Sequence, residues 1–145
     1  MPSGNSVNPV DAIGSRREAR ETALGILYAA DVQSRDLHAF LDERPVKPPE
    51  YAVDLVSGIA DVLGELDDLV GRFAEGWATD RMSVVDRALA RIAVFELLYR
   101  PDVPTAAVLS EVVELASEYS TDRSPRFVNG VAAAVAKEVR TDTDQ

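Results

Sequence analysis

The chain has 145 residues, of which 46% are hydrophobic and 28% charged, and its formal net charge at pH 7 is −10. This is the composition of one ordinary globular domain, and the negative charge argues against autonomous, non-specific nucleic-acid binding, which depends on many phosphate contacts. The absence of cysteine excludes disulfides, thiol nucleophiles and zinc–thiolate sites and fits a reducing cytoplasm, and no apolar run approaches the length of a membrane span.

The N-terminal region predicts a tail followed by a helix. Residues 1–14 are rich in Ser, Asn, Gly and Pro and offer little to bury, so we expect a disordered tail, and they lack the features of a secretory signal. Ser15 and Glu18 have the spacing of a capping box. Apolar residues then follow at helical spacing and predict an amphipathic helix over about 15–32: Ala19, Ala23, Ile26, Leu27 and Ala30.

The next region predicts one short and one long helix. A short helix over 36–43 precedes the proline-containing segment 44–50, which should break it. From Ala52 to Phe73, apolar residues keep a spacing of three and four for about six turns, which predicts one continuous helix.

Start and stop signals predict three more helices. The first spans residues 83–99 and ends before Pro101. The second opens near Thr105, after Pro104, and carries an acidic stripe of Glu111, Glu114 and Glu118. The third starts with Ser124 as N-cap and Pro125 at the first helical position and continues to residue 139. No segment alternates as a strand would. The expected fold is all-α, with six to seven helices in two small packed bundles within one domain, 15–140. We place the N-terminal subdomain at 15–76, the C-terminal subdomain at 77–140 and a tail at 141–145.

Few residues are candidates for catalysis. His38 is the single histidine and stands in a short acidic helix without a nearby ligand or nucleophile, so we interpret it as a surface residue. Glu96 lies close to the buried face of its helix, where a glutamate is more often a structural hydrogen-bonding group than a catalyst. No metal-ligand cluster, cofactor motif or glycine-rich phosphate loop is present. We therefore expect no enzyme activity.

Three arginines, Arg16, Arg17 and Arg20, stand at the start of the first predicted helix. A cation in the first turn opposes the helix dipole at a cost of about 0.3–1 kcal/mol. One interpretation is that this turn overhangs the bundle and presents guanidinium groups to RNA phosphate. The other is a salt-bridged surface, for instance with Arg17 paired to Glu21 one turn later. The residues alone leave both open.

Four segments together resemble the NusB family of bacterial transcription antitermination factors: RREARETALGILYAAD, VDRALARIAVFELL, PDVPTAAVLSEVVELASEYS and SPRFVNGV. The resemblance runs from about residue 15 to residue 137. It implies an all-helical fold of two subdomains, no catalytic activity, and binding of the single-stranded boxA element of ribosomal RNA leader transcripts. It also implies a heterodimer with NusE, a small-subunit ribosomal protein, within the RNA polymerase antitermination complex. A basic ribosomal protein suits an acidic body.

The resemblance assigns roles by position. The arginine-rich RNA-binding segment corresponds to Arg16, Arg17 and Arg20, and a second RNA-binding position corresponds to Arg126 and Phe127, where a base can stack and a phosphate can pair. Two positions that the family uses toward NusE correspond to Tyr28 and Asp86. Each has a structural alternative: Phe127 as core, Asp86 as a capping-box carboxylate after Ser83, and Tyr28 as a packed ring with an exposed hydroxyl.

Several positions depart from the family pattern. Gly25 replaces a longer polar residue, Arg123 replaces an often acidic one, and Pro125 precedes Arg126. Residues 132–134, all alanine, replace bulkier residues and indicate either a less filled helix or a self-association face. Monomer and homodimer both stay open. Four arginines on a single strand predict a log–log salt slope of roughly −3, so we expect weak RNA binding alone and tighter binding with NusE. The alternative function is a homodimeric or NusE-binding interaction module with little RNA affinity.

Overall fold

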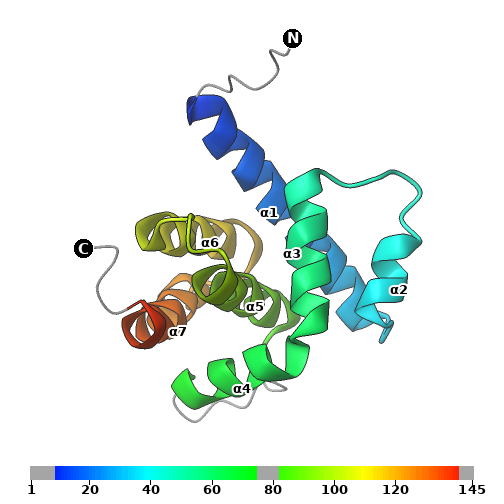
Figure 1. The fold of residues 1–145 in the computed structure, drawn as a ribbon. Coiled ribbons are helices and arrows are strands. Elements are labelled where there is room, and N and C mark those ends of the chain that lie inside the picture. Colours follow the sequence, from blue (N-terminus) through cyan, green and yellow to red (C-terminus); the bar gives the residue numbers. More distant parts are fainter. Residues whose placement is uncertain (1–8, 75–81, 141–145) are drawn as a thin grey trace.

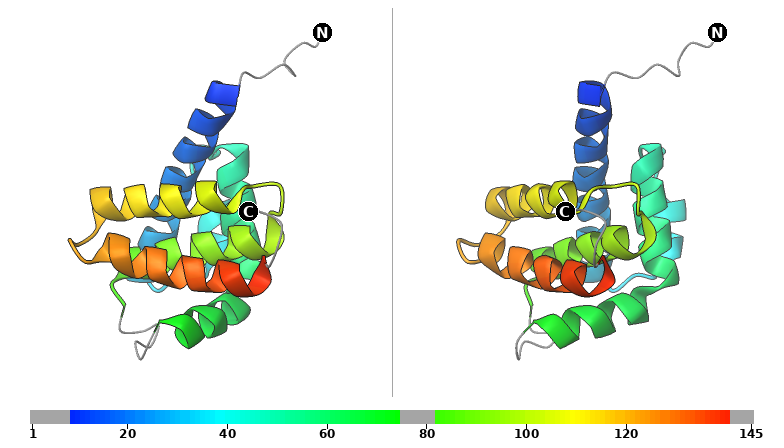
Figure 2. Two further views of the ribbon diagram at one scale, coloured as in Figure 1. Left: turned by 90° about the vertical axis from the view of Figure 1, so that its left-hand side faces the viewer. Right: turned by 60° about the vertical axis from the view of Figure 1, so that its left-hand side comes forward.

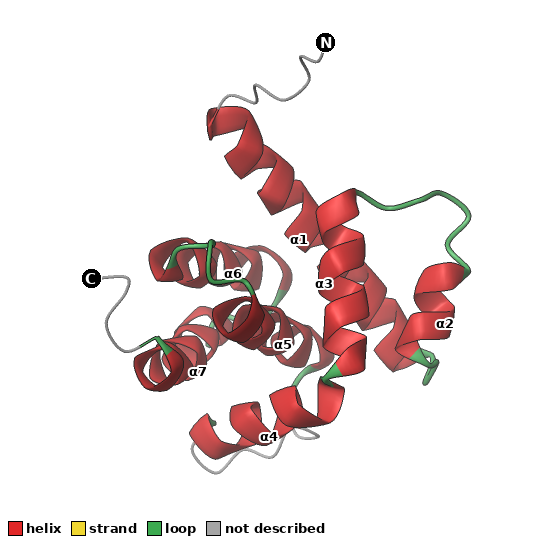
Figure 3. Ribbon diagram, in the orientation of Figure 1, coloured by secondary structure: helices red, strands yellow, loops and turns green. Residues whose placement is uncertain are grey.

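The computed structural model describes the backbone of residues 9–74 and 82–140, and within the first of these ranges the side chains from residue 16 onward. Regular secondary structure in these ranges is entirely helical (Figures 1 and 3). The helices are α1 (Pro9–Val32), α2 (Leu37–Asp42), α3 (Glu50–Asp61), α4 (Leu63–Phe73), α5 (Val84–Tyr99), α6 (Thr105–Tyr119) and α7 (Ser124–Val139). The predicted all-α fold is confirmed.

Helix α1 begins at Pro9, well before the expected start at Ser15. Proline suits the first helical position because its fixed φ matches the helix and its missing N–H would have had no partner there. The prediction of a tail is therefore wrong for residues 9–14, and residues 1–8 lie outside the described part. Arg16 stands about two turns inside the helix, so the first-turn dipole cost does not apply to it.

The long helix predicted from Ala52 to Phe73 is two helices. Val62, with φ −125° and ψ 28°, separates α3 from α4. The two halves bury their apolar faces on different neighbours: α3 packs on α1 and α5, whereas α4 turns to pack on α5 and α7 (Figure 1). The apolar spacing continues through the bend, so the sequence pattern gave no sign of it.

Helix α5 lies at the centre and packs against α1, α3, α4, α6 and α7. Helices α6 and α7 lie side by side, and α1 crosses them steeply (Figure 2). All seven described helices contribute to one hydrophobic cluster. The predicted boundary between residues 76 and 77 lies outside the described residues, so the division into two subdomains stays a prediction.

The starts of α5 and α7 follow the predicted signals closely. Ser83 Oγ accepts a hydrogen bond from the Asp86 N–H at 3.1 Å, as an N-cap should. Helix α7 starts one residue earlier than expected: Ser124 is its first helical residue, Arg123 precedes it, and Pro125 follows in the first turn.

Helix α3 packs closely on α5 at Gly58. A Cβ added to this glycine would lie 2.2 Å from the ring carbon Cζ of Phe95. Phe95 is 3% exposed, so its ring has little room to move. Glycine is therefore required for the close packing of α3 on α5.

Candidate nucleic-acid interface

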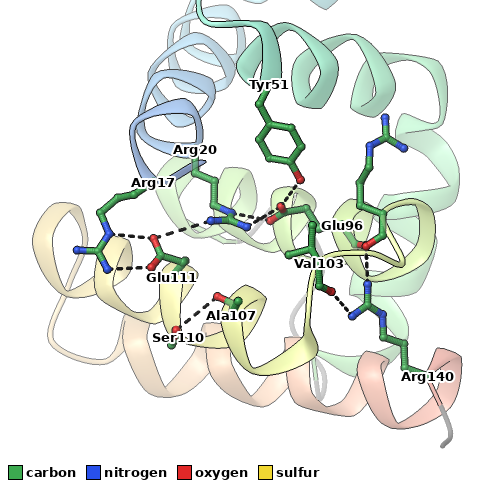
Figure 4. Close-up of polar contacts among 10 residues, drawn as sticks. Arg17, Arg20, Tyr51, Glu96, Val103, Ala107, Ser110, Glu111 and Arg140 are labelled. Carbon is green, nitrogen blue, oxygen red and sulfur yellow. Dashed lines mark hydrogen bonds and ion pairs between the residues drawn. The ribbon is translucent and has the colours of Figure 1, made fainter. Parts of the chain in front are cut away.

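Arg20 lies in the core and bonds to a buried carboxylate. Its Nε and Nη2 donate to the two carboxylate oxygens of Glu96 at 2.8 and 2.9 Å, and the Tyr51 hydroxyl donates to Glu96 Oε2 at 2.5 Å (Figure 4). The side chains of Arg20 and Glu96 are 3% and 0% exposed. The expectation that Arg20 presents its guanidinium group to solvent is therefore wrong, whereas the interpretation of Glu96 as a structural hydrogen-bonding group is confirmed.

The electrostatics of this buried network hold it in one protonation state. Burial opposes the charge on Arg20, but the hydrogen bonds and negative charge of Glu96 outweigh it and raise the pKa of Arg20. Burial, followed by the charge of Glu96, raises the pKa of the Tyr51 hydroxyl well above its ordinary value. The network joins α1, α3 and α5. Across the physiological pH range, Arg20 stays positively charged and the Tyr51 hydroxyl stays protonated.

Arg17 lies on the acidic stripe of α6 (Figure 4). Its Nε and Nη2 donate to the carboxylate of Glu111 at 3.1 and 2.8 Å, and Nη2 also pairs with Glu114 at 2.9 Å. The predicted partner Glu21 instead accepts a hydrogen bond from the Tyr119 hydroxyl at 2.6 Å. The Arg17 side chain is 49% exposed, so one side of it faces solvent. A phosphate that approaches Arg17 must compete with two carboxylates.

Arg16 stands at the outer edge of the same surface. Its Nη2 pairs with Asp102 at 3.2 Å, and its guanidinium carbon lies 5.3 Å from the centre of the Tyr51 ring. Tyr51 therefore supports Arg16 with its ring and Glu96 with its hydroxyl. Sequence reasoning missed this role because Tyr51 shows only as an aromatic residue near a helix start.

The start of α7 carries arginines of a different kind. Arg123 and Arg126 are exposed, and neither forms an ion pair within the described residues. Arg126 is in the first turn of α7, which holds no acidic residue. The dipole cost that the sequence suggested for α1 thus applies to Arg126.

Phe127 is half-buried, packs against the hydrophobic core and also lines two surface pockets. One of these, of about 330 Å³, is shared with the partner candidate Asp86. Asp86 Oδ1 accepts a hydrogen bond from Ser120 Oγ at 2.7 Å, and Ser124 Oγ donates to Ser120 Oγ at 2.9 Å. The Asp86 carboxylate thereby ties α5 to the turn between α6 and α7, and it stands beside Phe127.

Tyr28 is 45% exposed and lines a groove of about 460 Å³ between α1, α5 and α6. Gly25 opens this groove, since a Cβ there would meet nothing within 4 Å. Tyr119 lies in the same groove, and its hydrogen bond to Glu21 raises the pKa of Tyr119 to about 12. Val85 also lines this groove and directly precedes Asp86 in α5. The groove at Tyr28 and the pocket at Asp86, the two candidate partner-binding residues, are therefore next to each other.

Other chemistry is not evident in the described residues. They contain no group of three or more metal-ligating side chains, and none of their helices has the length and apolarity to cross a bilayer. His38 is a surface residue as predicted, and its Nε2 lies 2.8 Å from Asp61 Oδ1.

Comparison with known proteins gives consistent matches. The model of the NusB family matches residues 17–137. The transcription antitermination protein NusB of Salinispora arenicola is 51% identical over 130 residues, which cover 85% of this chain and 96% of that protein. A solved structure of T. maritima NusB has 36% identity and a TM-score of 0.77, covering 85% of this chain and 91% of that one. A structure of the antitermination factors NusB and NusE in complex with double-stranded RNA has 27% identity and a TM-score of 0.75, covering 86% and 97%.

Proposed function

Because this chain belongs to the NusB family, we propose that it is a transcription antitermination factor that binds boxA-type single-stranded RNA of ribosomal RNA leader transcripts as a heterodimer with NusE. The observation that carries the proposal is the similarity, over most of the chain, to NusB proteins, one of which was solved together with NusE and RNA. The relatives are named as regulatory proteins, which agrees with the expectation that this chain is not an enzyme.

The arginines divide between two roles in this proposal. Arg16 and Arg17, which are 38% and 49% exposed, contact RNA phosphate at the edge of α1. Arg126 pairs with phosphate and Phe127 stacks with a base at the start of α7. Arg20 holds α1 on α5 and is a positioning residue, because its guanidinium group is buried and pairs with Glu96 inside the core.

NusE binds the surface that Tyr28 and Asp86 border. The charge balance explains why a partner is needed: the chain carries −10, and the carboxylates of Glu111 and Glu114 already neutralise Arg17. A basic partner adds positive charge and contact area to a site that is weak alone. We place this complex in the cytoplasm, on the transcribing RNA polymerase. A homodimer that covers the same surface before NusE arrives is compatible with the proposal.

A fluorescence-anisotropy titration tests the proposal, with a boxA-type RNA, a scrambled RNA and a duplex of the same length, each with and without NusE. We expect selective binding of the single strand that tightens with NusE, and Arg16, Arg17 and Arg126 by themselves contribute about −2 to the log–log salt slope. Arg16→Gln together with Arg17→Gln should weaken binding without loss of folding. If NusE binds but no RNA does in any condition, the chain is an interaction module instead.

A further inference from the structure

A groove lies between α4 and α7. Its volume is about 530 Å³, within the range of sites that hold small ligands. Its lining contains two arginines and two phenylalanines, one of each from α4 and from α7: Arg72, Phe73, Arg126 and Phe127. The sequence pattern predicts Phe73 as an ordinary apolar residue at the end of an amphipathic helix and assigns Arg72 no role.

The cationic side of the groove is available to an anion. Arg126 is exposed and forms no ion pair within the described residues. Arg72 is 59% exposed and pairs with Glu138, itself 45% exposed, at 3.3 Å. Surface ion pairs of this kind contribute little to stability and exchange readily for another anion. Two guanidinium groups thus border one groove, and among the described residues a single exposed carboxylate, Glu138, pairs with one of them.

The aromatic side supplies flat surfaces beside these charges. Phe73 and Phe127 are both partly buried, so the core fixes each ring while part of it lines the groove. The guanidinium carbon of Arg72 lies 5.2 Å from the centre of the Phe73 ring. Aromatic rings next to arginines are what proteins use to bind single-stranded nucleic acid, with bases on the rings and phosphates on the guanidinium groups.

We propose that the α4–α7 groove binds a nucleotide of the RNA strand, with its base against Phe73 and its flanking phosphates paired to Arg72 and Arg126. This inference rests on the proposed function and extends the RNA surface from α7 to α4. Phe127 also lines the pocket that contains Asp86, so RNA in the groove lies next to the surface assigned to NusE. The competing occupant is a second copy of this chain, which would place a protein surface in the groove.

The test uses the heterodimer with NusE and boxA-type RNAs that carry 2-aminopurine at successive positions, because stacking on a ring changes the fluorescence of that base. The variants are Arg72→Gln and Phe73→Leu. The matched control is Arg35→Gln, in the turn between α1 and α2. Arg35 is also exposed and pairs with Glu43, and its guanidinium carbon lies 5.7 Å from the centre of the Phe40 ring. Affinity, salt slope and fluorescence are measured for each.

We expect Arg72→Gln to weaken binding about 3- to 5-fold and to reduce the magnitude of the salt slope by about 0.7, which is the share of one single-strand phosphate contact. Phe73→Leu should change the fluorescence at one RNA position and weaken binding about 5-fold or more, as expected for loss of a stacked base. Arg35→Gln should match the unmodified protein in all three measurements.

Three results would overturn the inference and can be told apart. If Arg126→Gln weakens RNA binding but Arg72→Gln and Phe73→Leu match the Arg35 control, RNA does not reach α4 and the proposed function still stands. If sedimentation velocity shows that the α4 variants change self-association and leave RNA affinity unchanged, the groove is an interface between copies. If the unmodified heterodimer binds no RNA, the inference fails together with the proposed function.

Discussion

Removing one partner of the buried Arg20–Glu96 pair and removing the whole network should affect stability in very different ways. In Glu96→Gln, a guanidinium group whose side chain is 3% exposed loses its carboxylate. Breaking a buried pair in this way costs about 3–5 kcal/mol, a large part of the roughly 5–15 kcal/mol that holds a domain folded. For a chain of this size the melting temperature should fall by about 10 °C or more.

The triple variant Arg20→Met, Tyr51→Phe and Glu96→Leu removes both charges and the hydroxyl that donates to Glu96 at 2.5 Å. No buried donor is left without an acceptor, so we expect a free energy of unfolding within about 1 kcal/mol of the original, or higher. The phenylalanine ring keeps the support under Arg16. Urea denaturation followed by circular dichroism measures the stability of both variants.

Comparing the triple variant with Arg17→Gln decides whether Arg20 stabilises the fold or contacts RNA. Since Arg20 is inside the core, the folded triple variant should bind boxA-type RNA with unchanged affinity, whereas Arg17→Gln should weaken it. The reasoning is refuted if the triple variant is stable but loses as much RNA affinity as Arg17→Gln. It is also refuted if Glu96→Gln costs less than about 1 kcal/mol, because the pair would then not behave as a desolvated one.

Three further outcomes follow from single contacts. Gly58→Ala should lower the free energy of unfolding by about 1 kcal/mol or more, because the new Cβ would meet the Phe95 ring carbon Cζ at 2.2 Å. Gly71→Ala, whose Cβ would meet nothing within 4 Å, should raise the free energy of unfolding by up to about 1 kcal/mol. Urea denaturation compares the two variants. The pKa of Tyr51 is raised from 10.0 in the folded state, so its contribution to stability is complete below pH 10 and is lost as the pH rises toward the folded pKa; Tyr51→Phe should flatten that alkaline loss in a denaturation series. Glu114→Gln should strengthen RNA binding about 2- to 5-fold by removing a competitor of phosphate, and Glu43→Gln, the same charge change far from the site, should not; parallel anisotropy titrations decide.

Local signals were enough to predict most helices but not how they join. Ser83, Pro101 and Pro104 act through short-range geometry, so the ends of α5 and the start of α6 could be read from sequence. The capping-box spacing at Ser15 predicts a start that the structure does not use, because Pro9, whose fixed φ suits a first helical residue, begins α1. The bend at Val62 depends on where α5 and α7 lie, and that is tertiary information.

The buried network was within reach of the sequence in one respect. The apolar stripe of the first helix, extended backwards, lands on Arg20, and Glu96 follows the buried face of its own helix. A cation and an anion that both stand on core-facing positions need each other, since neither is stable alone in the core. By contrast, no periodicity relates Arg16 to Asp102, with which it pairs, or Arg72 to Phe127, with which it lines one groove.

The arrangement of charge explains why RNA and protein partner should depend on each other. Among the arginines proposed to meet RNA, Arg17 is held by α6 carboxylates, and only Arg126, at the start of α7, lacks an ion pair in the described residues. Phe127, proposed to stack with RNA, and Asp86, proposed to contact NusE, line one pocket. A partner seated there changes the surface that RNA meets. By thermodynamic linkage, whatever factor NusE adds to the affinity for RNA, RNA must add to the affinity for NusE. We therefore expect this acidic chain to gain its RNA affinity from the complex and to hold NusE most tightly when RNA is present.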